Sequence, residues 1–417
     1  MSDPELERET RPVAVVGAGA AGLLAALTAA RRGLDVVLLE RTRDGGRKIL
    51  ISGGGRCNIL PAELQPERYV TDSSPNSLRK ILRAWPLEEQ RRFFEDVLGM
   101  PLEEEEETRK LFPATHRARD VRDGLVARVR EAGVRIWFDA RVSDVQPDDV
   151  GWTLSLYGAP TLRARAVILA TGGLSVPKTG SDGAGLSLAR ALGHEVVPTY
   201  PALTPLTVDP HPLGELAGVS ALVSITATPS KPAFSVTGAL LVTHRGWSGP
   251  SVLDASHVVT RVMGGGLAPD SEGAARLSVA WGSLGRSAWE RRLLTGPGTV
   301  GGVLAEILPR RLAAALGRCA GVPSDTSLSQ LTRVRREALV ETLTAYPLPW
   351  TGHGGYEKAE VTGGGVHLSE IDARTMESRR CPGLYLCGEI LDAFGPIGGH
   401  NFAWAWTTGR TAGLHVR

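Results

Sequence analysis

The sequence predicts an α/β fold, in which a three-layer domain with a parallel sheet and a small β-meander is split by an inserted β-barrel-like and helical domain. Three observations support this. An apolar strand pattern at 13–16 is followed by a glycine turn, a helical pattern and a second strand at 36–39. Short strand patterns recur between 134 and 170. A proline-rich stretch at 198–212 then introduces alternating apolar residues and amphipathic helices.

The first elements carry a nucleotide-binding motif. "VAVVGAGAAGLLAALTAARRGLDVVLLE" places Gly17-x-Gly19-x-x-Gly22 between a strand and a helix, and its second strand ends in Glu40. Glycines let the backbone turn against a pyrophosphate, the first helical amides bind it, and the acid accepts from ribose hydroxyls. Glu40 indicates an adenosine ribose without a phosphate. The motif predicts a Rossmann-like domain and fits NAD and FAD equally.

Three later segments favour FAD. "VRIWFDARVSDV", "WTLSLYG" and "RARAVILATGG" predict a meander that leads back to a strand ending near Thr171, which is typical of FAD-binding Rossmann domains. "GLYLCGEILDAFG" is a short buried strand that runs into Gly388 and Glu389, polar groups suited to the ribityl chain or the pyrophosphate. "GPIGGHNFAWAW" is a glycine turn opening a helix, whose first amides are expected to face the flavin pyrimidine.

Composition disfavours several classes. The charged first residues contain no apolar signal region, and the sequence has no stretch of 18 uncharged apolar residues. We therefore expect a soluble, cytoplasmic protein that does not associate with a membrane. The four cysteines form no C-x-x-C pair, which argues against a disulfide framework and against the flavin-disulfide reductases. A net charge of +2 indicates no strong nucleic-acid field. No metal site is expected.

The composition shift gives the expected domain boundaries. We place the FAD-binding domain at 1–192 and 350–417, and the inserted substrate or cap domain at 193–349. "SALVSITAT" and "GALLVTH" alternate as barrel strands do, and the segments 295–319 and 327–349 have amphipathic helical patterns.

Three groups of side chains have two interpretations each. His244, in "THRGWSGP", is either a proton donor or a hydrogen-bonded structural histidine. Three tryptophans either line a planar substrate or belong to the core: Trp247, Trp404 and Trp406. Three arginines of one predicted helix either bind RNA phosphates or form a solvated face: Arg333, Arg335 and Arg336.

Nearly the whole chain resembles the HI0933-like flavoproteins, also described as the BaiN/RdsA family of NAD(P)/FAD-dependent oxidoreductases. The resemblance rests on motifs that include "VVGAGAAGL", "GRKILISGGGRCN", "ATGGLSVPKTGSDGAG", "VTHRGWSGPSVLDAS" and "GLYLCGEILDAFGPIGGHNFAWAWTTGRTAG". It implies an FAD-binding Rossmann domain split by a β-barrel-like and helical insertion.

The resemblance also suggests a role for "GRKILISGGGRCN". In related flavoproteins this segment crosses the isoalloxazine ring, where bare backbone at Gly53–Gly55 would reach flavin N5 or O4. Arg47 and Lys48 would then reach pyrophosphate oxygens. Cys57 is either catalytic or a small buried filler.

The residues expected to contact FAD are Gly17, Gly19, Ala20, Ala21, Gly22, Glu40, Arg41, Arg47, Lys48, Gly53, Gly54, Gly55, Arg56, Asn58, Val142, Thr171, Gly172, Gly388, Glu389, Asp392, Gly398, Gly399, His400 and Asn401. The catalytic residue stays open, with Cys57 and His244 as candidates.

The implied activity is the reduction of a C=C bond conjugated to a carbonyl, with NAD(P)H as a transient electron donor to FAD. Family relatives are associated with enones of bile-acid type and with uracil in ribosomal RNA, so a small-molecule substrate and an RNA base both stay open. The alternatives are an RNA-modifying reductase of the dihydrouridine type and a flavin redox sensor without turnover.

Overall fold

A computed structural model describes residues 11–228, 234–264, 274–294 and 297–417. Contacts divide the chain into a first unit, which runs to Thr199 and resumes at Val361–Arg417, and an inserted unit, Tyr200–Glu360. Both boundaries fall later than the sequence suggested. Strand β11 (Val196–Ala202) pairs with β19 (Val361–Val366), and β18 (Gly352–His353) belongs to the inserted sheet, so pairing sets these limits.

A five-stranded parallel sheet forms the centre of the first unit. Its order is β20 (Leu384–Leu386), β10 (Ala166–Leu169), β1 (Val13–Val16), β2 (Val36–Leu39) and β6 (Arg135–Trp137). All residues of the first four strands are buried, as expected for parallel strands covered on both faces. The predicted parallel α/β fold is therefore confirmed.

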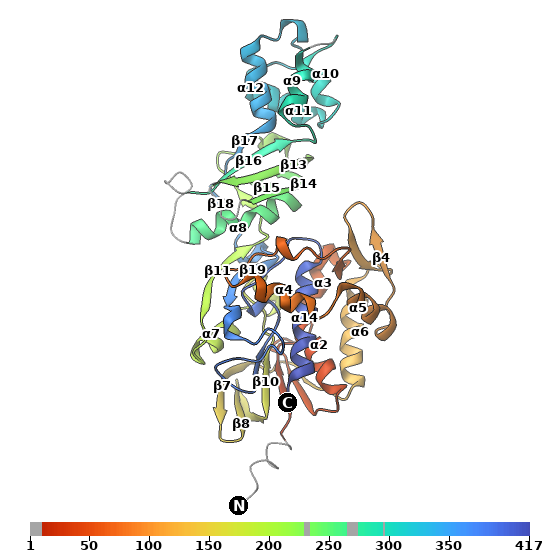
Figure 1. The fold of residues 1–417 in the computed structure, drawn as a ribbon, viewed down its shortest axis with the longest axis vertical. Helices are drawn as coiled ribbons and strands as arrows, with labels where there is room; N and C mark the ends of the chain where they lie inside the picture. Colours follow the sequence, from red (N-terminus) through yellow and green to blue (C-terminus); the bar gives the residue numbers. More distant parts are fainter. Residues whose placement is uncertain (1–10, 229–233, 265–273, 295–296) are drawn as a thin grey trace, which may run out of the picture. The chain divides into compact units, whose positions relative to one another are not determined.

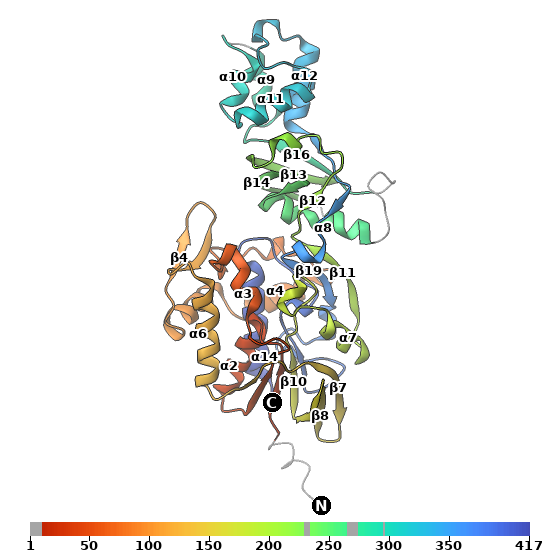
Figure 2. The same cartoon turned by 180° about the vertical axis from the view of Figure 1, so that it is seen from behind.

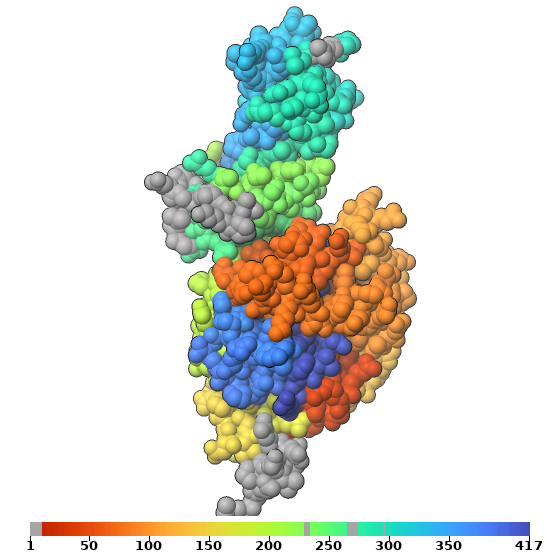
Figure 3. All heavy atoms as spheres, in the orientation of Figure 1, coloured from red at the N-terminus to blue at the C-terminus, as the bar shows by residue number. Residues whose placement is uncertain are grey.

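Helices and a meander cover the two faces of this sheet (Figures 1 and 2). Helix α2 (Ala20–Ala30) packs on β1, β2 and β10, and contacts both α6 (Ala118–Glu131) and α14 (His400–His415). The antiparallel strands β7 (Val142–Asp148), β8 (Gly151–Leu156) and β9 (Ala159–Ala164) form the meander, and β8 contacts β10. Residues from both ends of the chain adjoin on the visible surface of this unit (Figure 3).

Shorter elements complete the first unit. The helices are α3 (Arg47–Ile51), α4 (Pro75–Arg83), α5 (Leu87–Arg92), the π-helical turn Phe93–Val97 and α7 (Ala184–Ala191). The 3₁₀ turns span Ser52–Gly55, Pro66–Arg68, Pro177–Thr179, Leu368–Glu370 and Gly388–Ile390. The strands β3 (Leu60–Pro61), β5 (Lys110–Pro113) and β4 (Leu102–Glu105) form a small antiparallel sheet.

The inserted unit contains a seven-stranded antiparallel sheet. In hydrogen-bonded order its strands are β17 (Tyr346–Leu348), β16 (Arg276–Trp281), β13 (Ser220–Thr228), β14 (Phe234–Thr243), β15 (Gly246–Ser248), β12 (Leu206–Thr207) and β18. Alternate residues of β13 and β16 are buried, which is the predicted period of two.

The edges of this sheet must approach one another. Only 349–351 separates the edge strands β17 and β18, so Leu348 and Gly352 lie at most about 14 Å apart. A flat sheet of this order would be about 29 Å wide at ~4.8 Å per strand. The sheet therefore curls strongly, which accounts for the barrel-like pattern of its sequence.

Helices complete the inserted unit. Helix α8 (Pro250–Gly264) packs on β13 and β14, and α9 (Arg286–Leu294), α10 (Val300–Ala305), α11 (Arg310–Cys319) and α12 (Arg333–Thr344) contact one another. A short helix, α13, spans Gly355–Lys358, and 3₁₀ turns span Gly214–Leu216 and Leu328–Gln330. The helix expected at 295–319 is divided between α10 and α11, because Pro309 precedes α11 and cannot sit inside a helix. The first two residues of the expected helix, 295–296, lie outside the described residues.

Two glycines let α14 lie against α2. A Cβ on Gly409 would meet Ala21 O at 2.3 Å, and one on Gly413 would meet Ala25 O at 2.4 Å. These glycines are four residues apart, so they lie on the same face of α14. The close contact between the two helices therefore requires the absence of side chains at both positions.

Gly409→Ala is expected to lower the free energy of unfolding by about 1 to 3 kcal/mol, because the new methyl group would force the helices apart. Gly124→Ala in α6 is the matched control, since its Cβ would meet only Met100 Cε at 3.5 Å. The control should be neutral or stabilising by up to ~1 kcal/mol, the helix propensity difference. Urea denaturation of both variants measures this, and equal effects would contradict the packing argument.

Candidate FAD site

The predicted nucleotide-binding residues gather at one edge of the parallel sheet. The final residues of β20, β10, β1 and β2 are in register. Because parallel strands end at the same edge, the loops that follow them meet there, at the usual ligand-binding position of such sheets. Beyond these strand ends lie Gly17, Glu40, Thr171 and Gly388.

The glycine turn after β1 has the geometry expected of its motif. Gly17 has φ +102°, and a Cβ there would meet Ala170 O at 2.5 Å. A Cβ on Gly22 would meet Gly17 O at 1.8 Å. By contrast, nothing lies within 4 Å of a Cβ on Gly19, the N-cap of α2, and no side chain caps this helix. The first amides of α2, which include those of Ala20 and Ala21, thus have no side-chain acceptor at the cap.

Glu40 holds the glycine turn. Its Oε2 accepts a hydrogen bond from Ala18 N at 2.8 Å, and its Oε1 accepts from Thr42 N at 2.8 Å and Thr42 Oγ1 at 2.7 Å. The side chain is buried. Each carboxylate oxygen can accept more than one bond, so Glu40 can fix the turn and still accept from a ribose hydroxyl.

Thr171 carries a buried hydroxyl without a partner among the described residues. Its Oγ1 makes no hydrogen bond, although it is shielded from solvent. A Cβ on Gly185 would meet this oxygen at 1.8 Å, so the helix α7 passes directly over it. A buried hydroxyl without a partner costs free energy, and because α7 covers it, this cost belongs to the packing of Thr171 against Gly185.

Two of the basic residues expected at the cofactor, Arg41 and Arg47, contact protein groups. Arg41 forms an ion pair with Asp182. Arg47 Nε donates to Asp44 Oδ1 at 2.6 Å, and this hydrogen bond holds the pKa of Asp44 below its usual value. These contacts hold the cations to neighbouring loops, and their direct contact with phosphate stays a prediction.

Lys48 and Glu389 are brought together in one polar cluster. Lys48 Nζ donates to Glu389 Oε2 at 2.7 Å and to Ser175 Oγ at 2.6 Å, and Ser175 Oγ donates to Glu389 Oε1 at 2.6 Å. Thr362 N also donates to Glu389 Oε1, at 3.0 Å. Ser175 and Thr362 were not predicted as site residues. Ser175 lies more than 100 residues from both Lys48 and Glu389, and Thr362 lies 27 residues from Glu389, so no local spacing indicates these contacts.

The glycine triplet is exposed and entirely left-handed. Gly53, Gly54 and Gly55 have φ values of +55°, +66° and +86°, which L-residues with side chains rarely adopt. Arg56 lies over the Phe112 ring at 4.3 Å and pairs with Glu105 at 2.9 Å. The triplet is thus exposed and is followed by a side chain held in place by two contacts.

Cys57 and Asn58 face the protein interior. Burial raises the pKa of Cys57 to about 12, with a smaller opposing effect from Ser52, so the thiol stays protonated at neutral pH. The side-chain nitrogen of Asn58 donates to Leu60 O, and its side-chain oxygen accepts from Gly399 N, both at 3.0 Å. The structure therefore favours the filler interpretation of Cys57.

Gly388 and Asp392 have clear structural contacts. A Cβ on Gly388 would meet Ala21 Cβ at 2.9 Å, and its N–H donates to Thr408 Oγ1. Asp392 Oδ2 accepts from Ser73 N and Ser73 Oγ and from two further groups at 71–72. Burial raises the pKa of Asp392. This carboxylate anchors the segment 71–73.

The glycine turn before α14 is packed against the chain. Gly399 has φ +92°, and a Cβ there would meet the Leu60 carbonyl carbon at 2.4 Å. The Asn401 side chain closes the loop by accepting from Gly395 N at 2.9 Å. Burial lowers the pKa of His400 to about 4, so its ring is neutral at pH 7. Close packing alone thus accounts for Gly399, and a flavin contact here stays a prediction.

Two further predicted residues of the first unit, Val142 and Gly172, lie near strand ends, and His244 belongs to the inserted unit. Val142 begins β7, two residues after Ala140, whose N–H donates to Glu40 O at 2.8 Å. Gly172 has φ +71° after β10. His244 is exposed in the turn between β14 and β15 of the inserted unit, with no hydrogen bond among the described residues that would make it structural.

The tryptophans and arginines singled out above are structural or solvated. The indole nitrogens of Trp247, Trp404 and Trp406 donate to backbone carbonyl oxygens, and all three rings are buried. Arg333 on α12 pairs with Glu337 and is largely exposed.

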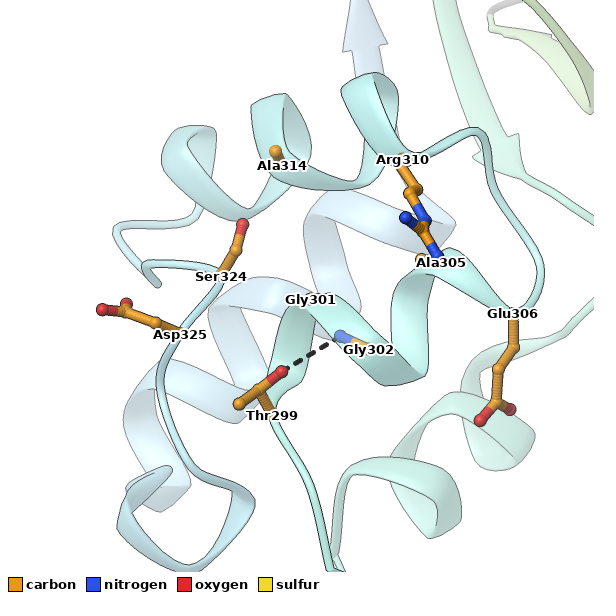
Figure 4. A pocket seen from close by; sticks show the side chains of 9 residues that line it. All are labelled: Thr299, Gly301, Gly302, Ala305, Glu306, Arg310, Ala314, Ser324 and Asp325. Carbon is orange, nitrogen blue, oxygen red and sulfur yellow. Dashed lines mark hydrogen bonds between the residues drawn. The ribbon is translucent and has the colours of Figure 1, made fainter.

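A hollow of about 640 Å³ lies in the helical part of the inserted unit (Figure 4). Arg310 reaches toward Ala305, whereas the Glu306 and Asp325 carboxylates point away from the space. It is lined by Thr299, Gly301, Gly302, Ala305, Glu306, Arg310, Ala314, Ser324 and Asp325. None of the residues expected to bind FAD lines this hollow.

The described residues show neither a metal-binding group nor a membrane span. Nowhere in the described ranges do three or more His, Cys, Asp or Glu side chains gather as a metal site. No described helix combines the length and apolarity needed to cross a bilayer.

The sheet edge fits FAD. The glycine turn, the α2 N-terminus without a side-chain cap and the exposed glycine triplet supply donors and close backbone for an extended dinucleotide. Together with the meander, they define the class as a Rossmann-type, FAD-binding oxidoreductase.

Comparison with known proteins identifies the family. The model of the HI0933-like protein Rossmann domain matches residues 11–415. A ribosomal RNA dihydrouridine synthase of Escherichia coli K12 is 35% identical over 399 residues, covering 94% of this chain and 95% of that protein. A 3-dehydro-bile acid delta(4,6)-reductase of Clostridium scindens is 32% identical over 408 residues, covering 96% and 98%. The chain belongs to the HI0933-like family.

A solved structure shares the fold. The 3-ketosteroid delta1-dehydrogenase of Sterolibacterium denitrificans aligns with a TM-score of 0.51 at 14% identity, covering 98% of this chain and 99% of that one. At this identity the likeness concerns the fold alone.

Glu40→Gln is expected to weaken FAD binding by about 1.5 to 3 kcal/mol, the scale of a charged hydrogen bond. It should also loosen the turn at Ala18, so the melting temperature of the apoprotein is measured beside the FAD dissociation constant. Glu131→Gln, at an exposed pair with Arg128, is the control and should change neither quantity. An unchanged FAD affinity in the folded Glu40 variant would contradict the ribose assignment.

Cys57 is expected to resist alkylation by iodoacetamide at pH 8, because it is buried and its pKa lies near 12. The exposed Cys319 serves as the internal control and should react first. The protein is labelled while folded, and mass spectrometry of its peptides then locates the modified thiol. Rapid modification of Cys57 would show that it is accessible and reopen its catalytic role.

Proposed function

We propose that the protein uses FAD to reduce a C=C bond conjugated to a carbonyl group, with NADH or NADPH as the electron donor. The site at the ends of β1, β2, β10 and β20 supports the FAD part of this proposal, and the glycine turn that leads into α2, a helix without a side-chain cap, is the observation that carries it. When bound, FAD takes up a hydride and passes it to an acceptor.

The relatives support the acceptor chemistry. One is named as a reductase of a 3-dehydro-bile acid and another as a synthase of dihydrouridine. A 3-oxo-Δ4,6 system and a uracil ring each contain a C=C bond conjugated to a carbonyl. An activated double bond of this type is therefore the shared substrate class that we assign to this chain.

The chain's own residues bind and orient the cofactor in this proposal. Glu40 accepts from the adenosine ribose, and the first amides of α2 face the pyrophosphate. The exposed amides of Gly53–Gly55 would contact the flavin ring, and Arg56, the next residue, is held by Phe112. Cys57 is poorly suited as the proton donor, because burial raises its pKa to about 12.

A second candidate is the uracil of ribosomal RNA, and the 35% identity to the E. coli synthase favours it. This candidate function requires binding to RNA. The affinity for RNA should fall steeply as the salt concentration rises, because phosphate contacts release counterions. A small enone would bind with little salt dependence. A flavin sensor would consume no NAD(P)H beyond one equivalent per flavin.

Steady NAD(P)H oxidation by the FAD-loaded protein tests the proposal. We expect turnover only when an acceptor is added, either a steroid enone or ribosomal RNA from cells that lack the gene. Dihydrouridine measured by mass spectrometry in that RNA would select the RNA base, and a saturated steroid would select the small molecule. Stoichiometric flavin reduction without turnover on either acceptor would support the sensor instead.

A further inference from the structure

We propose that residues 175–182 form a strap over the adenosine half of the bound dinucleotide and control its release. We call this segment the 175–182 strap. The proposal rests on the proposed FAD binding, and it assigns Arg41, Arg47 and Lys48 as positioning residues that act through the strap. None of the three then needs to touch the cofactor's phosphates.

Three cations from one segment hold the strap. Arg41 forms an ion pair with Asp182, and its Nη1 lies 3.5 Å from Gly180 O. Arg47 Nη1 donates to Lys178 O at 3.4 Å. Lys48 Nζ donates to Ser175 Oγ at 2.6 Å, in the cluster with Glu389. The cations therefore contact both ends of the strap, Ser175 and Asp182.

The middle of the strap lies beside the expected adenosine site. A Cβ on Gly180 would lie 3.3 Å from Thr42 Cγ2 and 3.7 Å from Glu40 Oε1. Ser181 is buried, and its Oγ lies 2.8 Å from the position of a Cβ on Gly172. The strap therefore adjoins the ends of β2 and β10, where the ribose acceptor stands.

The strap has a strained backbone that its contacts must maintain. Val176 has φ +48° and ψ +65°, although it is β-branched and precedes Pro177. Both features disfavour this conformation. Such conformations persist where surrounding contacts over-determine them, and they occur often at ligand clamps. Loss of an end contact should therefore let the strap open.

Asp182→Asn removes the Arg41 ion pair and keeps a side chain that can accept from Ala184 N at the start of α7. We expect FAD to leave this variant at least about tenfold faster than the wild type, measured by recovery of FAD fluorescence after dilution. Asp35→Asn is the matched control, because it removes the Arg135 pair before β2, at the end of the strand away from the strap. Its release rate should equal that of the wild type.

A double-mutant comparison separates the strap from direct contact. If Arg41 acts through the strap, the double variant Arg41→Gln/Asp182→Asn releases FAD no faster than Arg41→Gln alone. Additive effects of the two substitutions would overturn the proposal and indicate that Arg41 contacts the cofactor directly.

Limited trypsin digestion of the wild-type protein gives a second readout, which does not depend on the folding of any variant. Lys178 is exposed, and we expect FAD to protect the bond after it in the wild type. Equal cleavage with and without FAD, or equal release by Asp182→Asn and wild type, would overturn the strap. A wild-type protein that binds no FAD would instead refute the proposed function.

Discussion

The register of four buried parallel strands is the constraint on which the rest of the first unit depends. Because β20, β10, β1 and β2 end in register, four loops from distant parts of the sequence meet at one edge. The strands are buried on both faces, so a shift of one residue would place polar loop residues in the core. The apolar sequence of the strands therefore fixes the position of the site.

The site also depends on segments of backbone that pack closely against α2 and the turn before it. Gly22, Gly388 and Gly409 all lie where a Cβ would collide with α2 or the turn before it. These contacts bring α14 and the loop after β20 onto the nucleotide-binding helix, although they are almost 400 residues apart in sequence. The glycines thus serve packing as much as ligand contact.

Charge pairing inside the protein changes the role of several predicted ligands. Lys48 and Glu389 were each expected at the cofactor, and they neutralise one another through a direct ion pair and Ser175. A paired lysine presents less net charge to a phosphate than a free one does. Positioning of loops is accordingly the function that these contacts support directly.

The sequence alone determined the Rossmann motif, the parallel strands, the antiparallel insertion and the family, because these follow from local periodicity, glycine spacing and motif similarity. The resemblance also led to the expectation of bare backbone at Gly53–Gly55, and the structure adds that all three residues are left-handed. Only the tertiary structure decided which polar side chains face one another. Ser175 and Asp182 meet Lys48 and Arg41 across more than 100 residues, and Thr362 reaches Glu389 across 27, separations at which no local pattern encodes a pairing. The burial that keeps Cys57 protonated was likewise invisible in the sequence, because it depends on packing from distant segments.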